Sequence, residues 1–203
     1  MEFEFKKNEI VFDRELSNLD KLVLKFVKVL NKEKVDYVII SGYIAILFGR
    51  SRGTEDVDLF IEEMPFEKFN DLWNALNKNG FECINTSNSE EAYQEFLRNK
   101  TSIRFAEKGE FMPNFELKFP QTKYNQYSLK HKIRVLLNGE PLNTSEIELQ
   151  IAFKLNLGSD KDFEDARHLY KVFKEVLNIP LLKNQIRELG VEKEAEKILW
   201  KKD

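Results

Sequence analysis

The hydrophobic and polar positions of this chain follow two periodicities, which alternate along most of its length. Residues 19–31 place Leu22, Phe26 and Leu30 on one face at helical spacing, whereas residues 35–40 form a short apolar run typical of a buried strand. The alternation predicts an α/β core. The same patterns predict further helices at residues 43–48, 66–79 and 90–98, and further strands at residues 56–61, 81–84, 101–106, 114–119 and 133–137.

The last part of the chain has a different pattern. Asn138-Gly139 follows the last predicted strand and suits a type I′ hairpin turn, because both residues accept a positive φ. From Ser145 onward the apolar spacing is helical, and no repeat or low-complexity linker separates this tail from the core. We therefore predict two parts, an α/β core at residues 1–142 and a C-terminal helical subdomain at residues 143–203 that packs on it.

Composition limits the location of the protein. The chain has 203 residues, 42% of them hydrophobic and 17 of them Phe, which is ample for a packed core. Its longest uncharged stretch, residues 37–49, is shorter than the roughly 20 residues that span a bilayer. The first residues lack the apolar segment of a secretory signal. We therefore expect a cytoplasmic protein without a membrane partner.

The supply of metal-binding side chains and the charge narrow the function further. The single Cys83 excludes an internal disulfide, and with only His131 and His168 there is no zinc-type cluster, so any metal should have oxygen ligands. The net charge of −3 argues against a large basic surface for duplex nucleic acid. Charged residues of mixed sign make up 33% of the chain, which suits the ion-pair networks of a thermophilic protein.

The strand predicted at residues 56–61 carries two aspartates on one face. Because side chains alternate across a strand, Asp56 and Asp58 project together, with Cα atoms roughly 7 Å apart, while Val57 and Leu59 face the core. Two carboxylates held in this way are suited to bind a divalent metal. The alternative is that they form only the solvated face of an edge strand.

The segment before these aspartates shows a recognisable order of motifs. A buried strand, a small-residue turn and a short apolar helix lead into the sequence GYIAILFGRSRGTEDVDLFI, which contains Arg52, Thr54, Asp56 and Asp58. This order resembles the opening motif of the DNA polymerase beta-like nucleotidyltransferase superfamily, especially its AbiEii-type branch of minimal nucleotidyltransferases. The resemblance implies an α+β fold, with a nucleotidyltransferase-like mixed sheet flanked by helices and a C-terminal helical subdomain.

The resemblance also implies a metal site. In this superfamily a third carboxylate usually lies on a later strand, and Glu116 is the best candidate in residues 114–119. Asp56, Asp58 and Glu116 are then expected to be catalytic and to bind Mg²⁺ (or Mn²⁺), which prefers oxygen ligands. The alternative for Glu116 is an ordinary polar face that it shares with Lys118.

A nucleotide site is the second implication. Ser41-Gly42 stands where two glycines are commoner in the superfamily, but a small residue before Gly still lets backbone amides approach a phosphate. The amides of Ser41 and Gly42 would cradle the triphosphate of an NTP. Arg50 or Arg52 would serve as a charge clamp.

A polar stripe runs along the first helix of the tail. This helix, from Glu146, is apolar on most sides, and Gln150 and Lys154 form the stripe. A buried lysine needs an anionic partner, which a triphosphate, a catalytic carboxylate or a structural glutamate would supply. The block resembles the Lys motif and the following Lys/Arg-Asp-x-x-Asp motif of AbiEii-type proteins. This implies that Lys154 contacts phosphate and that Asp162 serves in the active site, a base being one role open to it.

Asp162 has a second interpretation. It lies within the sector of the core face of its helix, where polar residues are unusual. It also falls in the first turn after Ser159 or Asp160, where a carboxylate favours the helix dipole and needs no catalytic role. Asp165 is the alternative functional member of the pair.

These motifs predict a metal-dependent nucleotidyltransferase that transfers NMP from an NTP to an acceptor. The resemblance adds an RNA end such as tRNA, a protein or a small molecule as the acceptor, and a toxin role with an antitoxin partner. An inactive nucleotide-binding protein and an interaction domain with structural carboxylates are the alternatives. The enzyme hypothesis requires that five side chains converge on one cleft: Asp56, Asp58, Glu116, Lys154 and Asp162.

Overall fold

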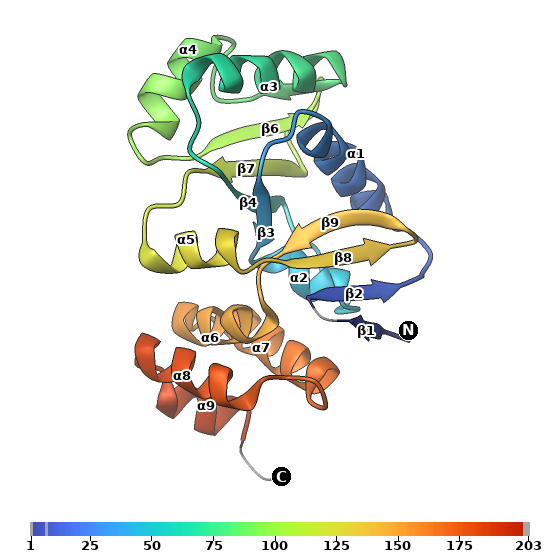
Figure 1. Cartoon of the computed structure of the whole chain (residues 1–203), viewed down its shortest axis with the longest axis vertical. Helices are drawn as coiled ribbons and strands as arrows, with labels where there is room; N and C mark the ends of the chain where they lie inside the picture. Colours follow the sequence, from blue (N-terminus) through green and yellow to red (C-terminus); the bar gives the residue numbers. More distant parts are fainter. Residues whose placement is uncertain (1, 7, 201–203) are drawn as a thin grey trace.

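A mixed sheet runs through the protein (Figure 1), whose computed structural model describes residues 2–6 and 8–200. Neighbouring strands are antiparallel except where β2 meets β8, β9 meets β3 and β4 meets β7, which are parallel pairs. Within the described residues the order is β1 (Glu4–Lys6), β2 (Glu9–Phe12), β8 (Ile133–Leu137), β9 (Glu140–Thr144), β3 (Tyr37–Ile40), β4 (Asp56–Ile61), β7 (Asn114–Lys118), β6 (Ile103–Glu107) and β5 (Phe81–Cys83).

Helices flank the sheet and lie at both ends of the molecule (Figure 1). Figure 1 shows α1 and α3 beside the β6 and β7 region, whereas α6 to α9 lie together at the opposite end, next to α5. The predicted α+β class, a mixed sheet flanked by helices, is confirmed. No described helix is both long and apolar enough to cross a membrane. The helices are α1 (Asn18–Lys32), α2 (Gly42–Leu47), α3 (Phe66–Lys78), α4 (Ser89–Glu91) with a π-helical continuation (Ala92–Leu97), α5 (Lys123–Lys130), α6 (Ile147–Leu157), α7 (Asp160–Phe173), α8 (Ile179–Leu189) and α9 (Glu192–Ile198).

An aromatic core behind β4 and β7 fixes which face of these strands carries the polar residues. Phe26 of α1 stacks on Phe115 of β7 with ring centroids 3.8 Å apart and meets Phe81 of β5 edge-on at 5.0 Å. Val57 and Leu59 of β4 are buried in the same core, as predicted. A slip of one residue in the strand register would exchange the two faces of the sheet. Burial of the apolar face therefore fixes the alternate residues of β4 and β7, which include the polar ones, on the opposite face.

Two local predictions are confirmed in detail. The predicted strand at residues 56–61 coincides with β4. Asn138 and Gly139, between β8 and β9, have φ of 51° and 80°, the positive values that a type I′ turn requires. Strand β9 continues to Thr144 before the helices begin. The division into a core at residues 1–142 and a subdomain at residues 143–203 stays a prediction.

The sequence patterns predicted no strands at residues 4–12 and no helix at residues 123–130, where the structure has β1, β2 and α5. Helix α5 is short, and a capping box starts it: Thr122 Oγ1 accepts from the amide of Asn125, whose Oδ1 accepts from the amide of Thr122. This signal lies in two polar residues, so hydrophobic spacing misses it. The omission matters because α5 forms one wall of the candidate site.

Candidate active site

The candidate carboxylates lie side by side on two parallel strands. In the register of β4 and β7, Asp58 is paired with Glu116, and Asp56 is paired with Asn114. Asp56 and Asp58 alternate on one strand and therefore share a face. The side chains of Asp58 and Glu116 are 16% and 11% exposed, so both carboxylates are largely withdrawn from water.

Cations and a hydroxyl surround this carboxylate pair. Lys118 Nζ lies 3.4 Å from Asp58 Oδ1 and 3.2 Å from Glu116 Oε2, and so bridges the two strands. Glu116 Oε1 also accepts from Ser102 Oγ at 2.5 Å and from the guanidinium of Arg104 at 3.2 Å. The sequence placed Lys118 on the face of Glu116 but gave it no role.

The environment separates the pKa values of the two carboxyls. Burial, a hydrogen bond shared with Glu116 and the repulsion of neighbouring carboxylates raise the pKa of Asp58 to about 6, against the attraction of Lys118. Burial also acts to raise the pKa of Glu116. There, hydrogen bonds from Ser102 and Asp58 and the charge of Lys118 prevail and lower the pKa to about 2. The two neighbouring carboxyls therefore differ in how readily they take up a proton.

The Ser41-Gly42 turn links β3 to α2 at the edge of this cluster. Ser41 has a φ of 64°, in the left-handed region that favours glycine, and its amide donates to Gln150 Oε1 at 2.9 Å. A Cβ on Gly42 would lie 2.3 Å from Nη2 of Arg52, so a larger residue here would require this arginine, which Asp165 holds, to shift. Gln150, which the sequence placed on a polar stripe, thus holds the turn and occupies the Ser41 amide that was predicted to cradle a triphosphate.

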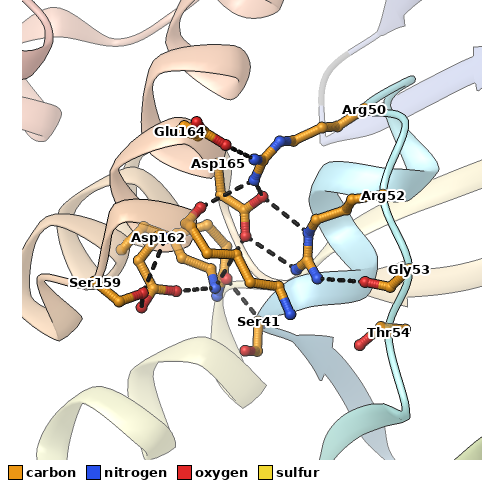
Figure 2. A network of polar contacts seen from close by, with 12 residues as sticks. Ser41, Arg50, Arg52, Gly53, Thr54, Ser159, Asp162, Glu164 and Asp165 are labelled. Carbon is orange, nitrogen blue, oxygen red and sulfur yellow. Dashed lines mark hydrogen bonds and ion pairs between the residues drawn. The ribbon is translucent and has the colours of Figure 1, made fainter.

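A network of ion pairs joins the loop before β4 to α7 (Figure 2). Asp165, whose side chain is 0% exposed, accepts from Arg52 Nε and Nη2 at 3.1 and 3.0 Å. It also pairs with Arg50, which in turn contacts Glu164. Both predicted clamp arginines are therefore engaged by carboxylates of α7.

Lys154 connects this network to the cavity. Its ammonium donates to Asp162 Oδ1 at 2.6 Å and lies 3.1 Å from Asp165 Oδ2. Asp162 also accepts from Ser159 Oγ at 2.6 Å, while its amide donates to that hydroxyl at 3.2 Å. Burial opposes these contacts, but hydrogen bonds from Lys154 and Ser159 lower the pKa of the Asp162 carboxyl. Asp162 therefore lies in the capped first turn of α7 and also serves the buried lysine.

A cavity of about 220 Å³ is lined by Asp58 and Lys154, two of the five side chains that were expected to converge, whereas Asp56, Glu116 and Asp162 are not part of its lining. Its lining includes Ser41, Asp58, Lys118 and Lys154. Glu116 contacts the lining residue Lys118, and Asp162 contacts Lys154. The remaining residues of the lining are Ile40, Phe60, Asn125, Ser128, Gln150, Phe153 and Leu157.

The remaining candidates are not part of the lining of this cavity. Asp56 lies on the same face of β4 as Asp58, two residues earlier, and its Oδ1 is 3.4 Å from Thr54 Oγ1. Gly42 lies beneath the guanidinium of Arg52. Arg50 and Arg52 both pair with Asp165. The structure thus places Ser41, Asp58 and Lys154 at the cavity, whereas the two arginines pair with Asp165 of α7.

The chemistry of the donors suits a hard divalent cation. Asp56, Asp58 and Glu116 offer carboxylate oxygens, the ligands that Mg²⁺ prefers. In the present side-chain positions, no three of the His, Cys, Asp and Glu residues described are grouped closely enough to hold a metal. Lys118 stands between two of the three oxygen donors. Metal binding by these residues therefore stays a prediction.

Solved structures with a similar fold are nucleotidyltransferases or resemble them. An antigenic nucleotidyltransferase-like protein from Paracoccidioides brasiliensis is 20% identical, with a TM-score of 0.54 over 91% of this chain and 94% of that one. ANT(2″)-Ia in complex with adenylyl-2″-tobramycin is 13% identical, with a TM-score of 0.57 over 86% and 98% of the two chains. A solution structure of the antibiotic-resistance factor ANT(2″)-Ia is 13% identical, with a TM-score of 0.55 over 89% of this chain and 97% of that one. The fold is therefore nucleotidyltransferase-like.

A family model extends this likeness from fold to sequence. The model described as "Nucleotidyl transferase of unknown function (DUF2204)" matches residues 19–201, and the chain belongs to this family. No curated protein matches the chain. The resemblance to the nucleotidyltransferase superfamily is confirmed, whereas the AbiEii-type branch stays a prediction.

Proposed function

We propose that this protein is a metal-dependent nucleotidyltransferase that transfers the NMP group of an NTP to an acceptor hydroxyl. The observation that carries the proposal is the pairing of Asp58 with Glu116 on adjacent parallel strands, beside a cavity that Lys154 borders from α6. A carboxylate pair opposite a buried ammonium provides for a cation and for a polyanion in one place.

The reaction exchanges one bond to phosphorus for another. The acceptor oxygen forms a bond to the α-phosphorus, the bond from that phosphorus to the oxygen that bridges to the β-phosphorus breaks, and pyrophosphate leaves with the electron pair. The acceptor proton passes to a carboxylate of the site or to water. Mg²⁺ or Mn²⁺, held by Asp56, Asp58 and Glu116, would supply charge neutralisation for the triphosphate.

The other residues have supporting roles in this proposal. Lys154 contacts phosphate, and Asp162 orients its ammonium. We assign Asp162 this orienting role and not that of a base, because a carboxyl with a lowered pKa is a poor proton acceptor. The Ser41-Gly42 turn borders the triphosphate. Arg50 and Arg52 act through Asp165, which fixes their positive charge next to the turn.

The acceptor in this proposal is an RNA end such as tRNA, a protein or a small molecule. The small-molecule choice draws support from ANT(2″)-Ia, whose solved complex contains adenylyl-2″-tobramycin. A toxin with an antitoxin partner, as in AbiEii-type proteins, is the biological role we infer from the motif order. Growth arrest on expression, relieved by Asp58→Asn, would support that role, and unaffected growth would remove it.

Label transfer tests the activity. The purified chain is incubated with Mg²⁺, each NTP labelled at the α-phosphate, and total tRNA, protein or aminoglycoside as acceptor. We expect transfer to at least one acceptor, its loss in Asp58→Asn, and its retention in Asp71→Asn, which removes an exposed aspartate of α3. NTP binding without transfer would indicate an inactive nucleotide-binding protein. Folded protein that binds neither Mg²⁺ nor NTP would leave only an interaction domain.

A further inference from the structure

Lys118 occupies a distinctive position in the carboxylate cluster. It lies on β7 two residues after Glu116 and therefore on the same face of the sheet. Its ammonium lies 3.4 Å from Asp58 Oδ1 and 3.2 Å from Glu116 Oε2. The same side chain lines the 220 Å³ cavity that Lys154 borders from α6. One cation thus contacts two candidate metal ligands and the cavity beside them.

This bridge affects any divalent ion that enters. Two largely buried carboxylates side by side need a nearby positive charge to remain ionised together. Lys118 supplies that charge to both, whereas Arg104 reaches only Glu116, from a side chain that is 49% exposed. A divalent ion that binds the same oxygens must displace the ammonium or accept its repulsion at close range.

We propose that Lys118 is a built-in counter-ion of the site: it holds Asp58 and Glu116 together without a metal, competes with a divalent ion, and transfers to a phosphate group in the cavity when that ion binds. The inference rests on the proposed function for its two ligands, a divalent cation and a triphosphate.

The side chain of Lys118 suits this exchange. Its charge is carried on a flexible four-carbon stem, and the ammonium is a compact donor that accepts several partners in turn. Both contacts to carboxylates exceed 3 Å, and the side chain is 33% exposed. Lys154 is 5% exposed and held by Asp162 and Asp165. Of the two cavity lysines, Lys118 is therefore the one that is free to move.

Manganese binding tests the competition. Mn²⁺ is titrated into the full chain, and free Mn²⁺ is followed by electron paramagnetic resonance. Lys118→Met keeps most of the side-chain length but removes the charge. We expect it to bind Mn²⁺ roughly tenfold more tightly, the factor expected for loss of the two competing ion pairs with Asp58 and Glu116. Lys25→Met, which removes the cation of an exposed pair with Glu107, should leave the affinity unchanged.

Inorganic tripolyphosphate tests the transfer to phosphate without reference to a nucleobase. In saturating Mg²⁺, titration calorimetry should show roughly tenfold weaker binding to Lys118→Met than to the unaltered chain. Lys25→Met should bind tripolyphosphate normally, because Lys25 pairs with the exposed Glu107 and does not line the cavity. Circular dichroism checks the fold of each variant, and Lys118→Gln replaces Lys118→Met if the latter unfolds.

The outcomes separate this inference from the proposed function. Equal or weaker Mn²⁺ binding by Lys118→Met overturns the inference, and so does unchanged tripolyphosphate binding. In both cases the unaltered chain still binds its ligands, and the proposed function stands. If the unaltered chain binds neither Mn²⁺ nor tripolyphosphate, both proposals fall together.

Discussion

Replacing Asp165 by asparagine should destabilise the protein strongly. The carboxylate is 0% exposed and faces Arg50, Arg52 and Lys154, whose side chains are 14%, 9% and 5% exposed. Each contact is worth about 4 kcal/mol at an effective dielectric constant near 20, but desolvation of the ions offsets most of the total. Asp165→Asn retains the shape and leaves three cations with too few partners. We therefore expect a loss of about 3–5 kcal/mol in the free energy of unfolding.

Urea denaturation followed by circular dichroism measures this loss, and the melting temperature should fall by roughly 10 °C. Glu164→Gln is the matched control, because it removes another partner of Arg50 from a side chain that is 61% exposed. That change should cost less than about 1 kcal/mol. If the two variants are equally stable, the network does not hold α7 on the core, and the argument that Asp165 fixes both arginines is refuted.

Three further predictions test other parts of the structure. Gly42→Ala places a Cβ 2.3 Å from the guanidinium of Arg52 and should lower the free energy of unfolding, measured in urea, by about 1–3 kcal/mol. A Cβ on Gly53 meets nothing within 4 Å, so Gly53→Ala should change it by less than about 0.5 kcal/mol. Equal losses in the two variants would contradict this packing. Burial raises the pKa of Asp58 from 3.8 to about 6, so the folded state holds a proton on this carboxyl more tightly than the unfolded state does. The stability that this proton provides is fully present below about pH 4 and is lost as the pH rises through 6. Asp58→Asn should therefore be close to neutral at pH 4 and stabilising by about 2–3 kcal/mol at pH 7. An equal effect in urea at both pH values would count against this assignment. Phe26→Ala removes a ring stacked in the core and should lower the free energy of unfolding, measured by calorimetry, by about 3–5 kcal/mol. Phe111 is 71% exposed, so Phe111→Ala should lower it by about 0.5 kcal/mol or less. A small loss for both variants would contradict the packing.

The sequence predicts best where one strand determines the geometry. Asp56 and Asp58 needed only the alternation of a strand, and the buried Val57 between them confirms which face they share. The partner of Asp58 was less accessible. Glu116 could be placed on a polar face, but its pairing with Asp58 depends on β7 lying beside β4, a contact between segments that are far apart in the chain.

The partners of the cations could not be predicted from local patterns. A buried Lys154 requires an anion, and phosphate and carboxylate satisfy that requirement equally well in a sequence. In the structure the anions are Asp162 and Asp165, and the latter also takes both arginines. Helix α5 was missed because a capping box, rather than an amphipathic stripe, marks its start.

The two lysines that border the cavity differ in a way that divides their work. Lys154 is 5% exposed and donates to Asp162 at 2.6 Å, with Asp165 3.1 Å away, so its ammonium is held in place by α7. Lys118 is 33% exposed and has contacts of 3.2 and 3.4 Å to Glu116 and Asp58. Because loss of rotamer freedom opposes binding, a cation that is already fixed costs less to use for positioning a ligand. A mobile cation is better suited to respond when charge enters the site. Under the proposed function, the phosphates of an NTP would therefore take their position from Lys154, while Lys118 would adjust to a bound metal.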